Sequence, residues 1–191
     1  IYLQLMKKQL GKDGPITEPD EYRKKLMDKV DIVSSEVERL NTIVMDFLAT
    51  IRPRKISPAP HSLNKIIEEV IILTKPELDS RHIELKVGLE ENMPLILLDK
   101  QYIRQAIINL VVNARDAMVK KKKGILTIKT EKNSESIILQ VSDTGEGIPN
   151  ENLSKLFDPY FTTKDSGTGI GLTIVYRTIK EHKGDIFVIS K

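Results

Sequence analysis

The sequence predicts an α+β fold, in which a helical segment precedes a mixed sheet with helices on one face. Three observations lead to this prediction. An apolar heptad pattern runs from Leu26 to Ile51, a group of prolines follows it, and the remainder alternates between helical and strand periodicity. Strand-rich and helix-rich stretches joined by short turns are typical of a layered α+β domain.

The composition permits a buried core and excludes several classes of protein. Of 191 residues, 40% are hydrophobic and 30% charged, and the net charge of +3 is spread along the chain. Nucleic acid is therefore not an expected partner. The absence of cysteine excludes disulfides and thiolate metal sites. No apolar run approaches the roughly 18 residues of a membrane span, so we expect no membrane contact by this segment.

Residues 1–52 are predicted to form two helices separated by a turn at 11–15, where glycine and proline cluster. In the second helix the apolar residues follow one another at alternating steps of four and three, which is a heptad pattern. These residues are Leu26, Val30, Val33, Val37, Leu40, Val44, Phe47 and Ile51. Residues 53–61 contain three prolines and are predicted to be a linker.

Residues 62–191 are predicted to form the second domain. Ser62 and Asp99 are suited to cap helices, because each precedes an apolar-periodic segment. In order, we expect a helix at 62–80, strands at 83–89 and 95–98, a helix from 99 to about 118, strands at 125–131 and 136–143, helices at 150–157 and 169–182, and a strand at 185–190.

Two motifs of this domain carry polar groups suited to a ligand. Asn109 and Asn113 are four residues apart and share one helical face, and an amide oxygen can bind a hard cation such as Mg²⁺. Asp143 ends an apolar strand and begins the sequence Asp-Thr-Gly-Glu-Gly, where Gly145 and Gly147 permit a close approach of backbone to a flat ligand. Taken singly, the asparagine pair is better explained by solvent-facing or capping amides, and a tight turn explains the glycine motif as well as a ligand site does.

Two further motifs follow. Residues 157–164 read Phe-Asp-Pro-Tyr-Phe-Thr-Thr-Lys. Outside a ligand site, the aromatic residues would serve to anchor a loop on the hydrophobic core. Residues 167–172 read Gly-Thr-Gly-Ile-Gly-Leu and open a helix, so backbone N–H groups there suit an anion. No Gly-Lys-Ser/Thr follows, so this is not a Walker loop.

In this order, the four motifs resemble those of the nucleotide-binding domain shared by sensor histidine kinases, GyrB-type topoisomerases, Hsp90 and MutL. The resemblance covers about residues 62–191 and implies an α/β sandwich that binds ATP and Mg²⁺. It implies that Asn109 and Asn113 bind the cofactor, with Asn113 as the Mg²⁺ ligand. Asp143 is implied to accept the adenine amine, and Gly145 and Gly147 to line the adenine pocket.

The resemblance also assigns the segment that follows. It implies that residues 157–167 form a mobile lid over the nucleotide and that Lys164 contacts a phosphate. Gly167, Gly169 and Gly171 are implied to bind the cofactor near its phosphates. The short lid resembles that of the sporulation-type and nitrogen-regulation-type kinases.

Two positions inform the choice within this superfamily. Many members carry Lys or Arg three residues after the second Asn, where this chain has Asp116; Arg115 beside it is expected to point elsewhere on the helix. ATP-hydrolysing relatives have a Glu at the position of Asn109, and an amide cannot act as a base. This favours phosphoryl transfer to a protein over hydrolysis.

Residues 1–52 resemble part of the antiparallel dimerisation hairpin of such kinases, which implies a homodimer with a four-helix bundle. The implied partners are a response-regulator receiver domain and a protein inhibitor or regulator of the hairpin. The family's acceptor His precedes an acidic residue and Asn-Pro, and His61, His82 and His182 lack this context. We therefore expect no catalytic residue in this chain and a phosphoacceptor His outside it.

This resemblance describes a cytoplasmic kinase core that lacks its final strand and does not autophosphorylate alone. Whether the intact protein is anchored in the cell membrane stays open. Two alternative functions also stay open: an ATP-driven conformational machine of the chaperone or mismatch-repair kind, and a non-catalytic scaffold that dimerises through residues 1–52.

Overall fold

The computed structural model describes residues 29, 30, 33, 56–119, 121, 123–164 and 167–190. The chain divides into two compact units, residues 1–52 and 53–191. The predicted hairpin lies almost wholly outside the described residues and stays a prediction. The helices and strands named below belong to the second unit, and no described helix is long and apolar enough to cross a membrane.

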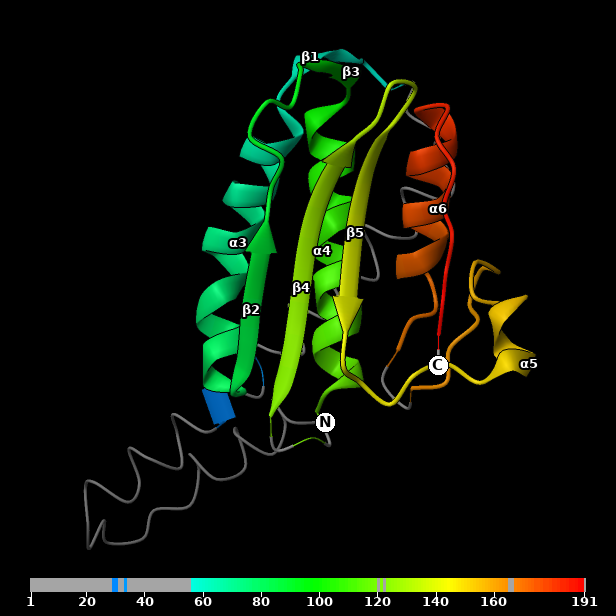
Figure 1. The fold of residues 1–191 in the computed structure, drawn as a ribbon. Coiled ribbons are helices and arrows are strands. Elements are labelled where there is room, and N and C mark those ends of the chain that lie inside the picture. Colours follow the sequence, from blue (N-terminus) through cyan, green and yellow to red (C-terminus); the bar gives the residue numbers. More distant parts are fainter. Residues whose placement is uncertain are drawn as a thin grey trace, which may run out of the picture. The chain divides into compact units, whose positions relative to one another are not determined.

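A mixed three-stranded sheet forms one layer of this unit. Strand β2 (Ile83–Gly88) pairs in parallel with β4 (Gly124–Lys132), which pairs antiparallel with β5 (Ile137–Asp143). The β4–β5 turn is stabilised by Asn133, whose Oδ1 accepts backbone hydrogen bonds from Glu135 and Ser136. A short antiparallel pair, β1 (Ala59–His61) and β3 (Ile96–Leu98), lies at one end of the domain (Figure 1).

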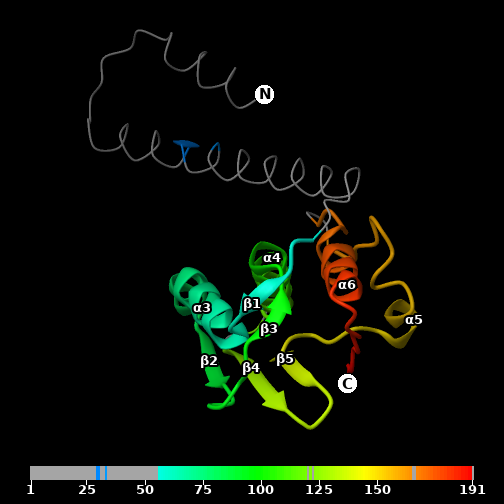
Figure 2. The ribbon, with the colours of Figure 1, turned by 90° about the horizontal axis from the view of Figure 1, so that it is seen from above.

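Helices α3 (Leu63–Ser80), α4 (Lys100–Ala117) and α6 (Gly171–Glu181) form the second layer, and all three lie on one side of the sheet (Figure 2). Apolar side chains from α3, α4 and the inner face of the sheet fill the space between the layers. The largest of them are fully buried: Ile66, Ile67, Val70, Ile107, Val111, Leu126 and Ile128. This arrangement confirms the predicted α+β layer with helices on one face.

Both predicted caps begin their helices. Ser62 Oγ accepts a hydrogen bond from the backbone N of Lys65, and Asp99 Oδ1 accepts from Gln101 N and Tyr102 N. The cap of α4 also connects distant segments, because the backbone N of Asp99 donates to His182 Nε2 over 2.8 Å. The first turn of α4 is thereby fixed to the end of α6.

The structure differs from four of the predicted elements. Strand β1 lies within the predicted linker, because its backbone pairs with β3. Helix α5 ends at Leu153 rather than at residue 157, since tight turns follow it. Helix α6 begins at Gly171, because Gly169 has a positive φ of 69° that a helix cannot contain. Residues 185–190 form no strand, because none of the described strands pairs with them.

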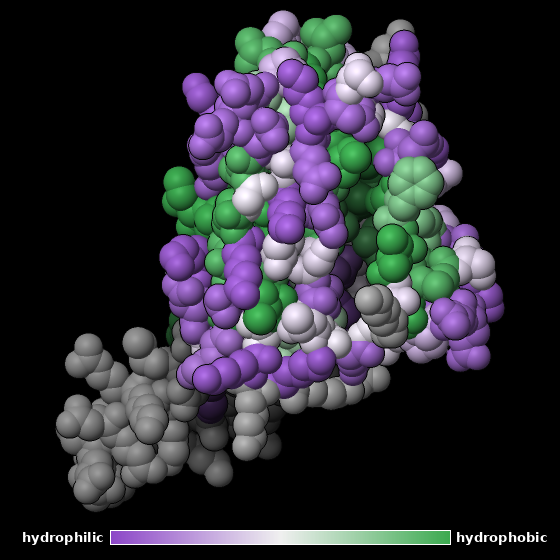
Figure 3. Space-filling view, in the orientation of Figure 1, coloured by the Kyte–Doolittle hydropathy of each residue, from purple (hydrophilic) through white to green (hydrophobic). Residues whose placement is uncertain are grey.

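Apolar side chains are exposed on the open side of the sheet, in and near the hollow between β5 and the segment after α6 (Figure 3). Phe187 and Ile189 of the unpaired segment are 86% and 90% exposed, and Ile138 of β5 is 45% exposed. The rest of this face carries mainly hydrophilic side chains.

Candidate nucleotide-binding site

Helix α4 presents the two predicted asparagines to segments that follow much later in the sequence. Asn109 Nδ2 donates a hydrogen bond to the backbone oxygen of Gly171, the first residue of α6, over 3.2 Å. Asn113 lies one turn further along the same face, and its Oδ1 accepts a hydrogen bond from Lys164 Nζ over 3.2 Å. The paired-Asn helix thus contacts two of the other predicted motifs.

Lys164 also forms an ion pair with Asp116, at 3.0 Å from Oδ2. The other carboxylate oxygen of Asp116 accepts hydrogen bonds from Arg115 Nε and Nη2, at 2.9 and 2.6 Å. Arg115 Nη1 lies 2.5 Å from Glu77 Oε1 on α3. Arg115 thus reaches α3, in agreement with the expectation that it points elsewhere on the helix, and its guanidinium also turns back on the neighbouring carboxylate, where opposite charge holds it.

This network keeps Asp116 and Arg115 charged. Burial raises the pKa of Asp116, but hydrogen bonds from Arg115 and Lys164 outweigh that effect and leave the pKa below its ordinary value. Burial likewise lowers the pKa of Arg115, and hydrogen bonds to Asp116 and Glu77 more than reverse it. Asp116 is consequently an anion at neutral pH, with a cation on each of its oxygens.

The first glycine motif lies against the last turn of α4. Asp143 Oδ1 accepts a hydrogen bond from Gly145 N over 2.7 Å, and Glu146 N donates to the backbone oxygen of Ala117. A Cβ on Gly145 would come within 2.6 Å of the Ala117 side chain, so only glycine fits here. Gly147 has a positive φ of 75°. Asp143 itself is exposed at the end of β5, where its carboxylate is accessible to a ligand.

The segment between α5 and α6 contacts α6 and also closes on itself. Thr173 Oγ1 donates to the backbone oxygen of Phe157 over 3.1 Å, and the Phe157 ring lies 5.1 Å from that of Tyr176. Further along, Tyr160 N donates to Gly169 O over 3.0 Å. Lys164 lies in the sequence between Tyr160 and Gly169, and its backbone N donates a hydrogen bond to Thr162 Oγ1.

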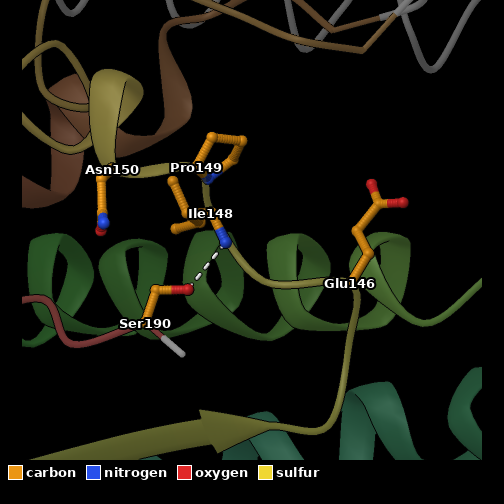
Figure 4. A pocket seen from close by; sticks show the side chains of 5 residues that line it. All are labelled: Glu146, Ile148, Pro149, Asn150 and Ser190. Atoms are coloured by element: carbon orange, nitrogen blue, oxygen red, sulfur yellow. Dashed lines mark hydrogen bonds between the residues drawn. The ribbon is translucent and has the colours of Figure 1, made fainter.

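A separate hollow of about 380 Å³ adjoins the first glycine motif (Figure 4). Its lining residues are Glu146, Ile148, Pro149, Asn150 and Ser190. Ile148 N donates to Ser190 Oγ over 2.7 Å, which connects the motif to the segment after α6. The lining contains no lysine or arginine, so this hollow does not suit the phosphates of a nucleotide.

The predicted site residues thus form two groups, and each group lies against a different part of α4. Near its middle, the first group joins the paired-Asn helix to the loop and the start of α6; its members are Asn109, Asn113, Lys164 and Gly171. Gly167 and Gly169 lie in the same loop. The second group, at the last turn of α4, contains Asp143, Gly145 and Gly147. Both groups border the same helix, as a ligand spanning from base to phosphates requires.

Sequence reasoning missed the role of Asp116 and its partners Arg115 and Glu77. One signal could have found it: Asp116 is three residues from Asn113 and therefore shares its helical face. The ion pair with Lys164 spans 48 residues of sequence and depends on the path of the loop.

The oxygen atom that Asn113 presents suits Mg²⁺ when the ion is bound together with a nucleotide. Asn113 Oδ1 already faces the cationic group of Lys164, and amide oxygen is a ligand that Mg²⁺ accepts. Among the described residues, no three His, Cys, Asp or Glu side chains group to hold a metal without help. The remaining ligands would therefore come from phosphates and water, which is the usual arrangement for Mg²⁺.

Comparisons with known proteins identify the family and the fold. The sequence profile of the family described as histidine kinase-, DNA gyrase B-, and HSP90-like ATPase matches residues 98–191. The chain is 33% identical over 195 residues to sporulation kinase C of Bacillus subtilis (strain 168), which covers 100% of the chain and 41% of that relative. The chain thus spans less than half the length of this curated relative.

Solved structures show the same fold. The nucleotide-free catalytic domain of histidine kinase ThkA is 31% identical, with a TM-score of 0.61 over 66% of this chain and 82% of that one. ThkA in complex with response regulator protein TrrA is 28% identical, with a TM-score of 0.71 over 94% of this chain and 49% of that one. With its motifs and fold, the chain belongs to the histidine kinase-, DNA gyrase B- and HSP90-like ATPase family, and its ATP-binding domain is that of a histidine kinase.

Proposed function

We propose that this chain is the ATP-binding core of a two-component sensor histidine kinase. In the intact protein it phosphorylates an acceptor histidine, and the phosphoryl group then passes to a response regulator. One observation carries the proposal: Asn113 on α4 and Lys164 in the loop, which are 51 residues apart, meet at 3.2 Å beside the start of α6. The complex of ThkA with TrrA supports the choice of partner.

The residues have distinct roles in this proposal. Asp143 accepts a hydrogen bond from the adenine amine, and the motif around Gly145 and Gly147 lets the base approach the backbone. Asn113 holds Mg²⁺, which supplies charge neutralisation at the phosphates. Lys164 adds a further positive charge. In phosphoryl transfer, catalysis consists mainly of positioning and electrostatic stabilisation, so no side chain here needs to act as a base.

Asn109 favours kinase over ATPase chemistry. Its amide donates to the backbone oxygen of Gly171 and so joins α4 to α6. An amide in this position cannot deprotonate water. None of the three histidines replaces the missing acceptor: His61 lies in β1, His82 in the turn before β2, and His182 is bonded to Asp99 N and Thr178 O.

Binding of a fluorescent ATP analogue with Mg²⁺ tests the site. Asn113→Ala and Asp143→Ala are each expected to weaken binding about tenfold or more, the cost of one lost hydrogen bond or ligand of about 1.4 kcal/mol. Asn92→Ala, an exposed change in the turn before β3, is the matched control and keeps wild-type affinity. Wild-type affinity in both site variants contradicts the assignment.

A further inference from the structure

Two oxygen atoms of α4 converge on one point, and an ammonium group lies there. Lys164 Nζ is 3.2 Å from Asn113 Oδ1 and 3.0 Å from Asp116 Oδ2. The two side chains are three residues apart, so they project from the same helical face. An amide oxygen and a carboxylate oxygen therefore contact the same cation.

The carboxylate is held in the orientation that this contact needs. Arg115 binds Oδ1 of Asp116 through Nε and Nη2, and Glu77 in turn binds Arg115. Only Oδ2 faces Lys164. The side chain of Arg115 is 17% exposed and that of Asp116 is 27% exposed, so the Arg115–Asp116 pair lies mostly inside the domain. Lys164 approaches this pair from the loop.

The same two oxygens suit a divalent cation. Mg²⁺ prefers oxygen ligands, and it is commonly bound by one or two carboxylates together with phosphates and water. An ammonium group and a divalent ion cannot share this point, because like charges a few ångströms apart repel strongly. Lys164 and the metal therefore compete for Asn113 and Asp116.

We propose that Asn113 and Asp116 together form the cation position of the nucleotide site, which Lys164 fills in the nucleotide-free chain and leaves when Mg²⁺ enters with ATP. This rests on the proposed function and adds two elements to it: Asp116 as a second oxygen at the metal, and Lys164 as the competitor of the metal. Once displaced, the ammonium group of Lys164 turns to the phosphates.

The test measures metal binding and needs no catalysis. A non-hydrolysable ATP analogue is mixed with an excess of the full chain, at a chain concentration well above the dissociation constant of each variant, so that nearly all analogue is bound. The mixture is titrated with Mn²⁺, whose unbound fraction is read by electron paramagnetic resonance. Asp116→Asn is expected to raise the half-saturating Mn²⁺ concentration about tenfold or more. Lys164→Met is expected to lower it about two- to fivefold, the range of a partly exposed ion pair.

The opposite signs distinguish this proposal from a structural ion pair. If Asp116 and Lys164 only stabilise each other, both substitutions break the same contact and shift Mn²⁺ binding in the same direction. Lys100→Met is the matched control, since it removes the partner of Glu69 at the other end of α4 and leaves Mn²⁺ binding unchanged.

The remaining outcomes are also decisive. If the analogue binds but Asp116→Asn leaves the half-saturating concentration unchanged, the cation position is wrong and the proposed function stands. If the wild-type chain binds no analogue at all, the proposed function fails and the cation position fails with it. Should Asp116→Asn not fold, Lys164→Met decides alone, because its half-saturating concentration must fall.

Discussion

Single residues determine how the loop between β5 and α6 reaches its helix. Gly169 has a φ of 69°, and a Cβ there would overlap the backbone of Tyr160. Tyr160 itself has a φ of 66° and donates its backbone N–H to Gly169 O. Two residues with left-handed backbone thus face each other across one hydrogen bond. No side chain can be accommodated at Gly169 without moving one of them.

Gly169→Ala is therefore expected to lower the free energy of unfolding by about 1–3 kcal/mol, the cost of a strained backbone position. The measurement is urea unfolding followed by circular dichroism, since the chain has no tryptophan. The control is Gly88→Ala, whose added Cβ would lie 3.5 Å from Lys129 Cγ, an ordinary contact. Equal stability of the two variants would show that the loop base adapts freely.

At the scale of elements, α4 is the support on which the site is built. Its N-cap, Asp99, accepts hydrogen bonds from the first turn through Oδ1 and from Ser57 N through Oδ2. Its backbone N–H donates to His182 at the end of α6. One residue thus fixes the start of α4 against the segment before β1 and against α6.

Asp99→Ala is expected to destabilise the second unit by about 1–2 kcal/mol, the usual cost of losing an N-cap. Urea unfolding measures the change. Asp99→Ser, which keeps a capping oxygen, should recover most of the loss. A serine variant as unstable as the alanine variant would assign the effect to the contact with Ser57 instead of the cap.

At the scale of the whole molecule, the chain consists of two units, and every site residue discussed here belongs to residues 53–191. The proposed homodimer depends on the heptad pattern of residues 1–52. Nucleotide binding and dimerisation should therefore be separable by substitution.

Val37→Asp places a charge in the heptad pattern and is expected to convert a dimer into a monomer, because an unpaired charge in an apolar interface is strongly unfavourable. Sedimentation equilibrium gives the mass, and the affinity for the fluorescent ATP analogue should stay at the wild-type value. Glu36→Gln, outside the heptad positions, should leave the dimer intact. An unchanged mass for Val37→Asp would exclude this interface.

The sequence predicted best those elements that local rules define. Helices α3 and α4 begin where Ser62 and Asp99 indicate, because a cap acts on the turn directly after it. The length of α5 and the state of residues 185–190 were predicted incorrectly. Both depend on neighbours in space: a strand exists only where another backbone pairs with it, and periodicity within residues 185–190 contains no information on such a partner.

In the candidate site, too, local features could be predicted from the sequence and contacts between distant segments could not. The motifs around Asn113 and Lys164 could be found in the sequence, since each is a short pattern. Their contact, and the position of Asp116 beside them, could not. From the sequence, Asp116 is only an acidic residue at a position where many relatives have a basic one. The structure shows that it pairs with Lys164 and Arg115.

The hydrogen bond between Tyr160 and Gly169 has a consequence for how this family of chains can diversify. It closes the loop at its base, so the chain enters and leaves the loop at a hydrogen-bonded pair of residues. Lengthening a closed loop costs only about 0.6 kcal/mol for each doubling. An insertion between these two residues that leaves Lys164 in place is consequently expected to spare the helix–sheet scaffold.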